Sequence, residues 1–198
     1  MKNLFTVEDA AMLLIDHQQG TIKLAVNIDH DHLVANTRAL ARTAVETGMP
    51  LLLTTSEETN FQGPLIDDLK ELAPEAYDAR VKRPGVVDAW TYDPFREAVE
   101  ALGRKRLIMA GLTNDVCTVY PAISAVEAGY DVQCVIDAGG SPTQVADEMA
   151  GQRMARHGVT VTSTNQIMAE LATDWSSENG RKIQGVMYEE ILKPLVEA

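Results

Sequence analysis

The chain has 198 residues, of which 45% are hydrophobic and 23% charged, and its formal net charge is −12. This length and composition are typical of a globular protein with one full core, so we expect a single domain over residues 1–198. The negative charge argues against a nucleic-acid partner, because such a protein needs a positive surface to meet phosphates. No apolar run is long enough to cross a bilayer, and the N-terminal stretch lacks the layout of a signal peptide. We therefore expect a cytoplasmic protein without a membrane partner.

Short apolar runs alternate with longer amphipathic stretches along the chain. Strands are predicted at 11–15, 50–55, 106–110, 131–138 and 159–163, with a weaker one at 79–81. Helices are predicted at 33–48, 66–72, 95–103, 116–129, 141–158 and 165–171. The helix from 141 has Ser141 as its expected cap and Pro142 at its first position. Residues 175–198 form an extension whose apolar stripe suits a helix that packs on the domain or on another subunit.

Strands that are apolar throughout, each followed by a helix, indicate a parallel sheet covered on both faces. The fold class is therefore α/β, a three-layer α/β/α sandwich around a doubly wound, mostly parallel sheet of Rossmann type. Ligands of such folds bind beyond the carboxyl ends of the strands. The residues expected on that rim include Asp16, Gln18, Glu58, the pair Lys82 and Arg83, and the segment 111–117.

Several kinds of site are excluded by missing motifs. The glycine patterns of dinucleotide and P-loop sites are absent, and so is a G-x-S-x-G nucleophile elbow. The cysteines, Cys117 and Cys134, lack the paired spacing of a zinc site, and His30 and His32 fit a solvated turn better than a metal site. We predict neither a metal nor any other cofactor.

Cys117 is the strongest candidate for chemistry. If Asn114 caps the following helix, Cys117 takes its third position, where unpaired N–H groups and the helix dipole favour thiolate. The same N–H groups could hold an oxyanion, Asp16 could accept the proton, and Lys82 or Arg83 could supply a positive charge. A packing role is the commoner one for such a cysteine, and only the shared rim favours catalysis.

The sequence resembles the isochorismatase-like cysteine hydrolases over roughly residues 8–175. The resemblance is carried by "AMLLIDHQ", "LLLTTSEETNFQGPL", "VKRPGVVDAW", "LIMAGLTNDVC" and "GYDVQCVIDAGGS", and is strongest to the YcaC-like branch. It implies the three-layer fold and a triad of acid, lysine and cysteine, with Asp16 and Cys117 at the first and last positions. It also implies a cis peptide at Leu112–Thr113, which would direct the backbone N–H groups of Thr113 and Cys117 at an oxyanion.

The chain departs from the family pattern at two positions. Asn114 stands where the family usually has threonine. The family's lysine aligns with Arg83, whereas the neighbouring Lys82 is the expected residue type, so both stay candidates for the catalytic cation. Arginine cannot release its proton and could only stabilise charge. The metal-binding Asp-x-His of nicotinamidases is missing after the second strand, which argues against that activity.

We therefore predict a cysteine hydrolase of a small molecule, acting on an amide or related C–N bond through a thioester-type intermediate with Asp16 as general acid and base. Gln18, Glu58, Trp90 and Tyr120 are the predicted substrate contacts. The family resemblance also predicts a homo-oligomer. Two alternatives stay open: a cysteine-based redox or isomerase activity at the same site, and a binding protein with vestigial catalytic residues.

Overall fold

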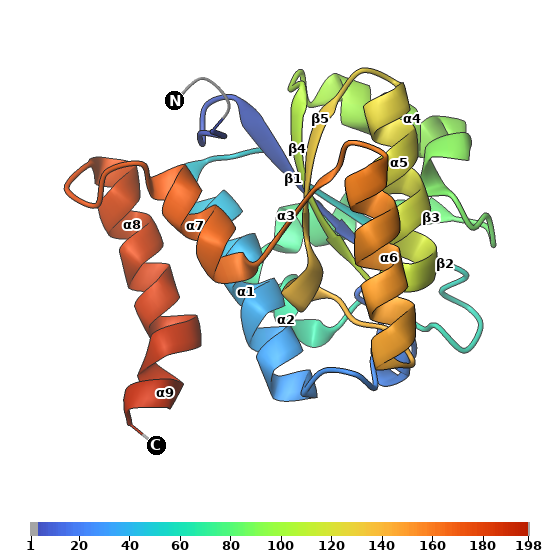
Figure 1. Cartoon of the computed structure of the whole chain (residues 1–198), viewed down its shortest axis with the longest axis horizontal. Coiled ribbons are helices and arrows are strands. Elements are labelled where there is room, and N and C mark those ends of the chain that lie inside the picture. Colours follow the sequence, from blue (N-terminus) through green and yellow to red (C-terminus); the bar gives the residue numbers. More distant parts are fainter. Residues whose placement is uncertain (1–3, 198) are drawn as a thin grey trace.

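A computed structural model describes residues 4–197 and places a six-stranded sheet at the centre of the fold (Figure 1). The strand order is β3-β2-β1-β4-β5-β6, and every neighbouring pair is parallel. The strands are β1 (Ala10–Ile15), β2 (Leu51–Ser56), β3 (Val81–Arg83), β4 (Arg106–Gly111), β5 (Asp131–Val135) and β6 (Thr160–Thr162). Residues 1–3 and 198, which include the start of the stretch assessed for a signal peptide, lie outside the described residues.

Helices cover both faces of the sheet, which confirms the three-layer sandwich (Figure 1). Helices α1, α2, α7 and α8 pack on one face, and α4, α5 and α6 pack on the other. The helices are α1 (His30–Thr47), α2 (Asp67–Leu72), α3 (Pro74–Asp78), α4 (Asp93–Ala101), α5 (Val119–Glu127), α6 (Gln144–Arg156), α7 (Thr164–Ala172), α8 (Glu178–Met187) and α9 (Lys193–Val196). Among residues 4–197, no helix combines the length and apolar character that crossing a membrane requires.

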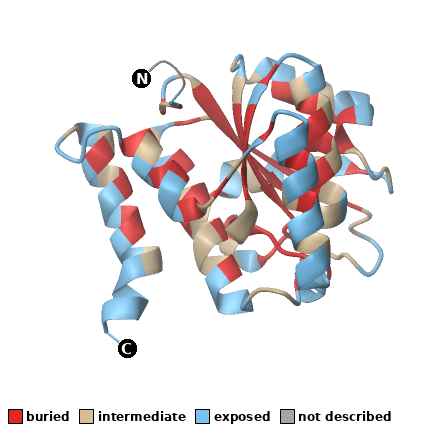
Figure 2. Ribbon diagram, in the orientation of Figure 1, coloured by how far each residue is buried: buried red, intermediate tan, exposed pale blue. Residues whose placement is uncertain are grey.

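The central strand β1 divides the core into two parts. Its side chains alternate, so that Met12 and Leu14 join the cluster under α1 while Leu13 and Ile15 join the cluster under α4 and α5. All six of its residues are buried, and the strands stand out as the buried centre of the molecule (Figure 2). A strand buried on both faces explains why its sequence is a continuous apolar run.

Several predicted elements have other bounds. The strand predicted at 131–138 ends at Val135, and the helix predicted at 116–129 is Val119–Glu127. The third strand is Val81–Arg83 rather than 79–81, so that Lys82 and Arg83 lie within it and Ser56 pairs with Arg83. Helix α6 begins at Gln144, and Thr143 caps it by accepting a hydrogen bond from the backbone N–H of Ala146. Ser141 lies three residues before the first residue of the helix, and its hydroxyl donates to another acceptor, described below.

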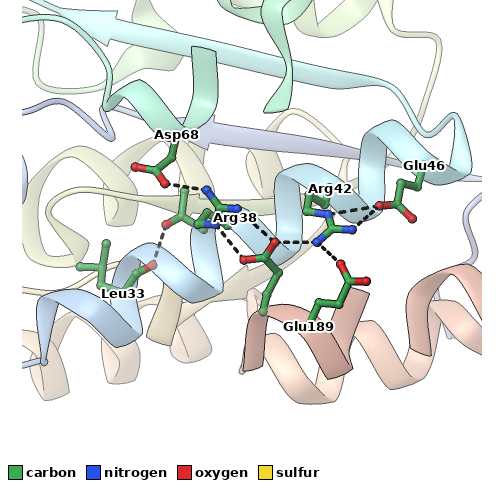
Figure 3. A network of polar contacts seen from close by, with 8 residues as sticks. Leu33, Arg38, Arg42, Glu46, Asp68 and Glu189 are labelled. Carbon is green, nitrogen blue, oxygen red and sulfur yellow. Dashed lines mark hydrogen bonds and ion pairs between the residues drawn. The ribbon is translucent and has the colours of Figure 1, made fainter. Parts of the chain in front are cut away.

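Most of the C-terminal extension packs against α1. The side chains of Ile183, Val186 and Met187 join the core, and the π-helical segment Tyr188–Leu192 follows α8 without a break. Glu190 lies 2.7 Å from both Arg38 and Arg42 of α1. Figure 3 shows these two arginines with further partners, among them Asp68, Glu46 and Glu189. Helix α9 has no buried residue, so the chain's last described turn lies on the surface.

Candidate active site

Asp16 follows β1 directly, at the carboxyl edge of the sheet. Its backbone N–H donates to the carbonyl of Thr54 in β2, and its φ of 57° places it in the left-handed region, which aspartate tolerates better than most residues. The side chain is buried, with 1% exposure. Because β1 lies between β2 and β4, Asp16 stands where the chain switches from one half of the sheet to the other, the usual ligand position in such folds.

Arg83 reaches Asp16 from β3, two strands away. Its Nη2 lies 2.6 Å from Oδ1 and 2.5 Å from Oδ2 of Asp16, and Nε donates to Thr54 Oγ1 at 3.0 Å. Lys82 faces the other way, as alternate residues of a strand must, and its exposed Nζ lies 3.4 Å from Glu58. Of the two candidate cations, the structure therefore brings Arg83 to the carboxylate and leaves Lys82 on the surface.

Cys117 lies in a π-helical turn, Asn114–Thr118, that follows β4. The Leu112–Thr113 peptide is cis, as the resemblance implied. The Cys117 thiol and the Asp16 carboxylate face the same cavity, and each shifts the pKa of the other. Arg83, Asp16 and Cys117 thus form one row along the rim of the sheet, in which Arg83 is bonded to Asp16.

Gly111 permits the sharp turn before Cys117. A Cβ at this position would lie 2.6 Å from Thr118 Oγ1 and 2.9 Å from the carbonyl oxygen of Ile15. Both distances are shorter than any ordinary contact, and the second involves backbone that cannot move away. Only glycine therefore lets β4 pass so close to the end of β1, where Asp16 begins.

Asn114 does not cap a helix, contrary to the prediction. It is completely buried, and its Nδ2 donates to the carbonyl of Ile136 and to Oδ1 of Asp147, both at 2.9 Å. The same Asp147 oxygen accepts the Ser141 hydroxyl at 2.8 Å. Because the turn is π-helical, the amide points into the protein rather than back at its own backbone. Asn114 thus anchors the cysteine turn to the segment between β5 and α6.

Burial dominates the electrostatics of the site. It raises the pKa of Asp16, against the opposing effect of the Arg83 guanidinium. Burial, followed by the negative charge of Asp16, raises the pKa of Cys117 to about 12, and Arg83 and the Thr113 N–H oppose this only in part. The expected thiolate is therefore wrong for the resting state, in which sulfur carries its proton. A carboxylate next to a thiol can take that proton when the sulfur attacks.

A cavity of about 170 Å³ opens in front of this row. Its polar lining comes from Asp16, Thr21, Ser56, Gln62, Thr113 and Cys117. Its apolar lining comes from Leu24, Phe61 and Val116, whose side chains are substantially exposed and form the rim. The cavity therefore has an apolar entrance and a polar floor.

The four predicted substrate contacts do not line this cavity. Gln18 is fully buried and bonds with the backbone of β2 on both its amide atoms, while Glu58 forms an ion pair with Arg80. Trp90 belongs to the core under α4, and the ring of Tyr120 lies under a guanidinium from α6. The geometry gives no support to substrate binding by these side chains.

Sequence reasoning missed the residues that form the rim. Phe61 lies in the irregular loop after β2, and its side chain is 63% exposed. An exposed aromatic residue in a loop at the carboxyl edge of a parallel sheet was an available signal. Leu24 ends a short 3-10 turn, Thr21–Leu24, whose proximity to the loop could not be deduced from the sequence.

His17, next to Asp16, takes no part in the cavity. Its side chain is fully buried, its Nε2 lies 2.8 Å from the carbonyl oxygen of Ala138, and burial lowers its pKa to about 4. It is therefore neutral at ordinary pH and tethers the end of β1 to the segment after β5. Within residues 4–197, no group of three His, Cys, Asp or Glu side chains is placed to hold a metal ion.

Comparison with known proteins agrees with this fold. Residues 10–166 match the model of the isochorismatase domain. The chain is 38% identical over 170 residues to the probable hydrolase YcaC of Escherichia coli K12, covering 86% of this chain and 81% of that protein. The crystal structure of YcaC from Pseudomonas aeruginosa superposes with a TM-score of 0.92 at 34% identity, covering 100% and 97% of the two chains. The Escherichia coli YcaC structure gives the same TM-score at 35% identity, covering 100% and 96%. The chain therefore belongs to the isochorismatase family, in its YcaC-like branch, and is a hydrolase of that family.

Proposed function

We propose that this hydrolase cleaves a C–N bond of a small amide or related compound, with Cys117 as the nucleophile. The observation that carries the proposal is the row of Arg83, Asp16 and Cys117 at the floor of a cavity. A thiol with a raised pKa needs a base beside it, and Asp16 lines the same cavity. Arg83 keeps the carboxylate oriented and offsets its charge, but cannot itself transfer a proton.

Acylation begins as the Cys117 thiol proton moves to Asp16 and the sulfur forms a bond to the substrate carbonyl carbon. The C=O electron pair moves to oxygen, and the backbone N–H groups of Thr113 and Cys117 are the proposed donors to that oxyanion. The tetrahedral intermediate then collapses. The C–N bond breaks, the nitrogen takes the proton from Asp16, and an amine or ammonia leaves a thioester on Cys117.

Deacylation follows the same chemical steps, with water as the nucleophile in place of the thiol. Water gives a proton to Asp16 as its oxygen bonds to the thioester carbon. The C–S bond breaks as the second tetrahedral intermediate collapses, and the sulfur recovers the proton from Asp16. The products are a carboxylic acid and the free thiol. Asp16 thus acts in turn as base and acid, a role that suits a carboxyl group whose pKa is raised by burial.

The relatives bear on the nucleophile and not on the substrate. The Pseudomonas aeruginosa YcaC structure is described as containing hexane-2,5-diol and covalent acrylamide, and a nucleophile that adds to the alkene of acrylamide leaves its amide bond intact. The Escherichia coli YcaC is described as a hydrolase of unknown specificity. The redox alternative has less support, because Cys134 is fully buried in β5 and offers no accessible second thiol.

The test is release of ammonia or amine from a panel of small amides, ureas and carbamates. Cys117→Ser is expected to abolish release, while Cys134→Ala, which removes the other thiol from the core, is expected to retain it. Retention of turnover by the Cys117→Ser variant would contradict the proposal. Loss of turnover in both variants, with both still folded by circular dichroism, would contradict it as well.

We also propose that the protein assembles into a homo-oligomer in the cytoplasm. The Escherichia coli relative is described as octameric. Trp175, Tyr188, Leu192 and Leu195 leave large apolar side chains exposed at the C-terminal end of this chain, where a second copy could cover them. Light scattering after size exclusion tests the assembly, and a monomer at micromolar concentration would contradict it.

A further inference from the structure

The net charge of the cavity lining limits which substrates can bind, and the proposed mechanism does not depend on it. Among the described residues, Asp16 is the one lining residue with a charged side chain, and Arg83 behind it neutralises that charge. The rest of the lining is hydroxyl, amide, thiol and hydrocarbon. A site that binds a substrate carboxylate needs a cationic donor, and the lining contains none.

Arg83 cannot serve as that donor. Its three nitrogen atoms bond to Asp16, to Thr54 Oγ1 and to the carbonyl oxygen of Val86, and its side chain has no exposed surface. The nearest other cations in the sequence are Arg80, just before β3, and Lys82, within it, and both are paired with Glu58 outside the cavity. An anion in the cavity would therefore face the Asp16 carboxylate with no partner of its own, in a molecule whose net charge is already −12.

The size of the cavity limits the substrate further. A volume of about 170 Å³ lies below the roughly 300–1,000 Å³ of common ligand pockets, so the cavity suits a small molecule. Larger substituents would contact Leu24, Phe61 and Val116 at the rim, which favour hydrocarbon over charge.

We propose that this site takes small, electrically neutral acyl compounds, and that it rejects carboxylate-bearing compounds of equal size. The inference rests on the proposed function for the reaction, but the charge preference belongs to the cavity and can be measured without hydrolysis. It names the substrate class as short, uncharged amides whose acyl chain is apolar, with the chain against the rim and the carbonyl at Cys117.

Iodoacetamide and iodoacetate form a matched pair of probes, because they have the same size and differ in charge. In both, Cys117 sulfur bonds to the CH₂ carbon, the C–I bond breaks, iodide leaves, and the thiol proton passes through Asp16 to solvent. Modification at Cys117 is followed by peptide mass mapping. The ratio of the iodoacetamide rate to the iodoacetate rate is then divided by the same ratio measured with 2-mercaptoethanol. We expect this normalised ratio to favour iodoacetamide by at least about tenfold. A ratio near one, or a preference for iodoacetate, would overturn the inference.

Gln62→Lys adds a cation to the lining, and Gln62→Met is the matched uncharged control. Gln62 is partly exposed and its side chain makes no hydrogen bond within the described residues, so both changes should fold. The lysine variant is expected to lower the normalised ratio at least about fivefold relative to the methionine variant. Equal ratios in the two variants would show that charge at the cavity does not select the reagent, which overturns the inference.

A hydrolysis assay distinguishes failure of this inference from failure of the proposed function. 3-Methylbutanamide and malonamate have the same number of non-hydrogen atoms and test a neutral against an anionic acyl group, and 3-methylbutanamide should be cleaved with the larger kcat/KM. If no amide is cleaved while the alkylation ratio favours iodoacetamide, the proposed function fails and the charge preference stands. If malonamate is cleaved as well as 3-methylbutanamide, the hydrolase stands and the charge preference fails.

Discussion

One nitrogen of Arg83, Nη2, lies within 2.6 Å of both carboxylate oxygens of Asp16, and both side chains are buried. The other two nitrogens bond to Thr54 and Val86. A lysine would bring the same charge to this position but could not donate in all these directions at once. The arginine therefore holds the carboxylate in one orientation from a distance of two strands.

Removal of this guanidinium should destabilise the protein. Arg83→Met leaves the Asp16 carboxylate buried without a partner, which costs about 3–5 kcal/mol of unfolding free energy. Arg83→Lys keeps the charge and should fall between this variant and the parent. Urea denaturation measures all three. Lys82→Met is the control, because that exposed pair is worth less than about 1 kcal/mol, and equal losses in the two methionine variants would contradict the account.

The buried His17 predicts a specific loss of stability in acid. Its pKa is about 4 in the folded protein and 6.5 in the unfolded chain, so between these values the unfolded state binds more protons. The contribution of His17 to the free energy of unfolding is complete above pH 6.5. It falls by about 3 kcal/mol as the pH drops to 4. His17→Gln should therefore show a flatter stability curve in this range than the parent.

The exposed His157 provides the matched control for His17. It bonds to the carbonyl oxygen of Arg153 at 2.9 Å on the surface. Stability is measured by urea denaturation at half-unit steps from pH 4 to pH 7. If His157→Gln flattens the curve as much as His17→Gln does, burial of His17 is not the cause.

The electrostatic effect of Asp16 on Cys117 predicts opposite effects on ionisation and on turnover. The negative charge of Asp16 raises the pKa of Cys117, so Asp16→Asn should lower it from about 12. The same variant loses the base, and its hydrolysis should fall by about 10² or more. The rate of iodoacetamide labelling at Cys117 against pH measures the first, and ammonia release the second. A Cys117 pKa that rises in Asp16→Asn would show that the two groups are not coupled in this way.

Asp147 is expected to position the cysteine turn from a distance. Asp147→Ala leaves the buried Asn114 amide and Ser141 hydroxyl without their shared acceptor, at a cost of about 1–3 kcal/mol. Because Asn114 lies in the turn of Cys117, kcat should fall more than KM rises. Asp147→Asn keeps an oxygen at this position and should recover part of kcat. Equal kcat in all three proteins would limit Asp147 to a structural role.

The three layers of the fold and the reactive pair, Asp16 and Cys117, could be predicted from the sequence, because they depend on local patterns. Continuous apolar runs marked the strands, and glycine marked the ends of helices, so Asp16 and Cys117 could be placed on one rim. The choice between Lys82 and Arg83 required the register of β3, which has three residues and no apolar run. The state of the thiol depended on burial, which a helix-start argument could not include.

The cavity lining was the least predictable part. It joins a 3-10 turn after β1, a loop after β2 and the turn after β4, and no periodicity relates these segments. Aromatic residues were assigned to the pocket by type, yet Trp90 fills the core and Phe61, from an irregular loop, forms the rim. Ser141 and Asn114 were assigned as helix caps, but tertiary partners at Asp147 and Ile136 take their hydrogen bonds.

The central claim is that Cys117 carries the acyl group during turnover, and rapid-quench mass spectrometry tests it most directly. The protein is mixed with propanamide, quenched in acid within one turnover, digested, and the peptide that contains Cys117 is weighed. The account predicts that this peptide gains the mass of a propanoyl group, that the gain disappears as product forms, and that Cys134 stays unmodified. Turnover of propanamide with no acyl group on Cys117 at any time would contradict it.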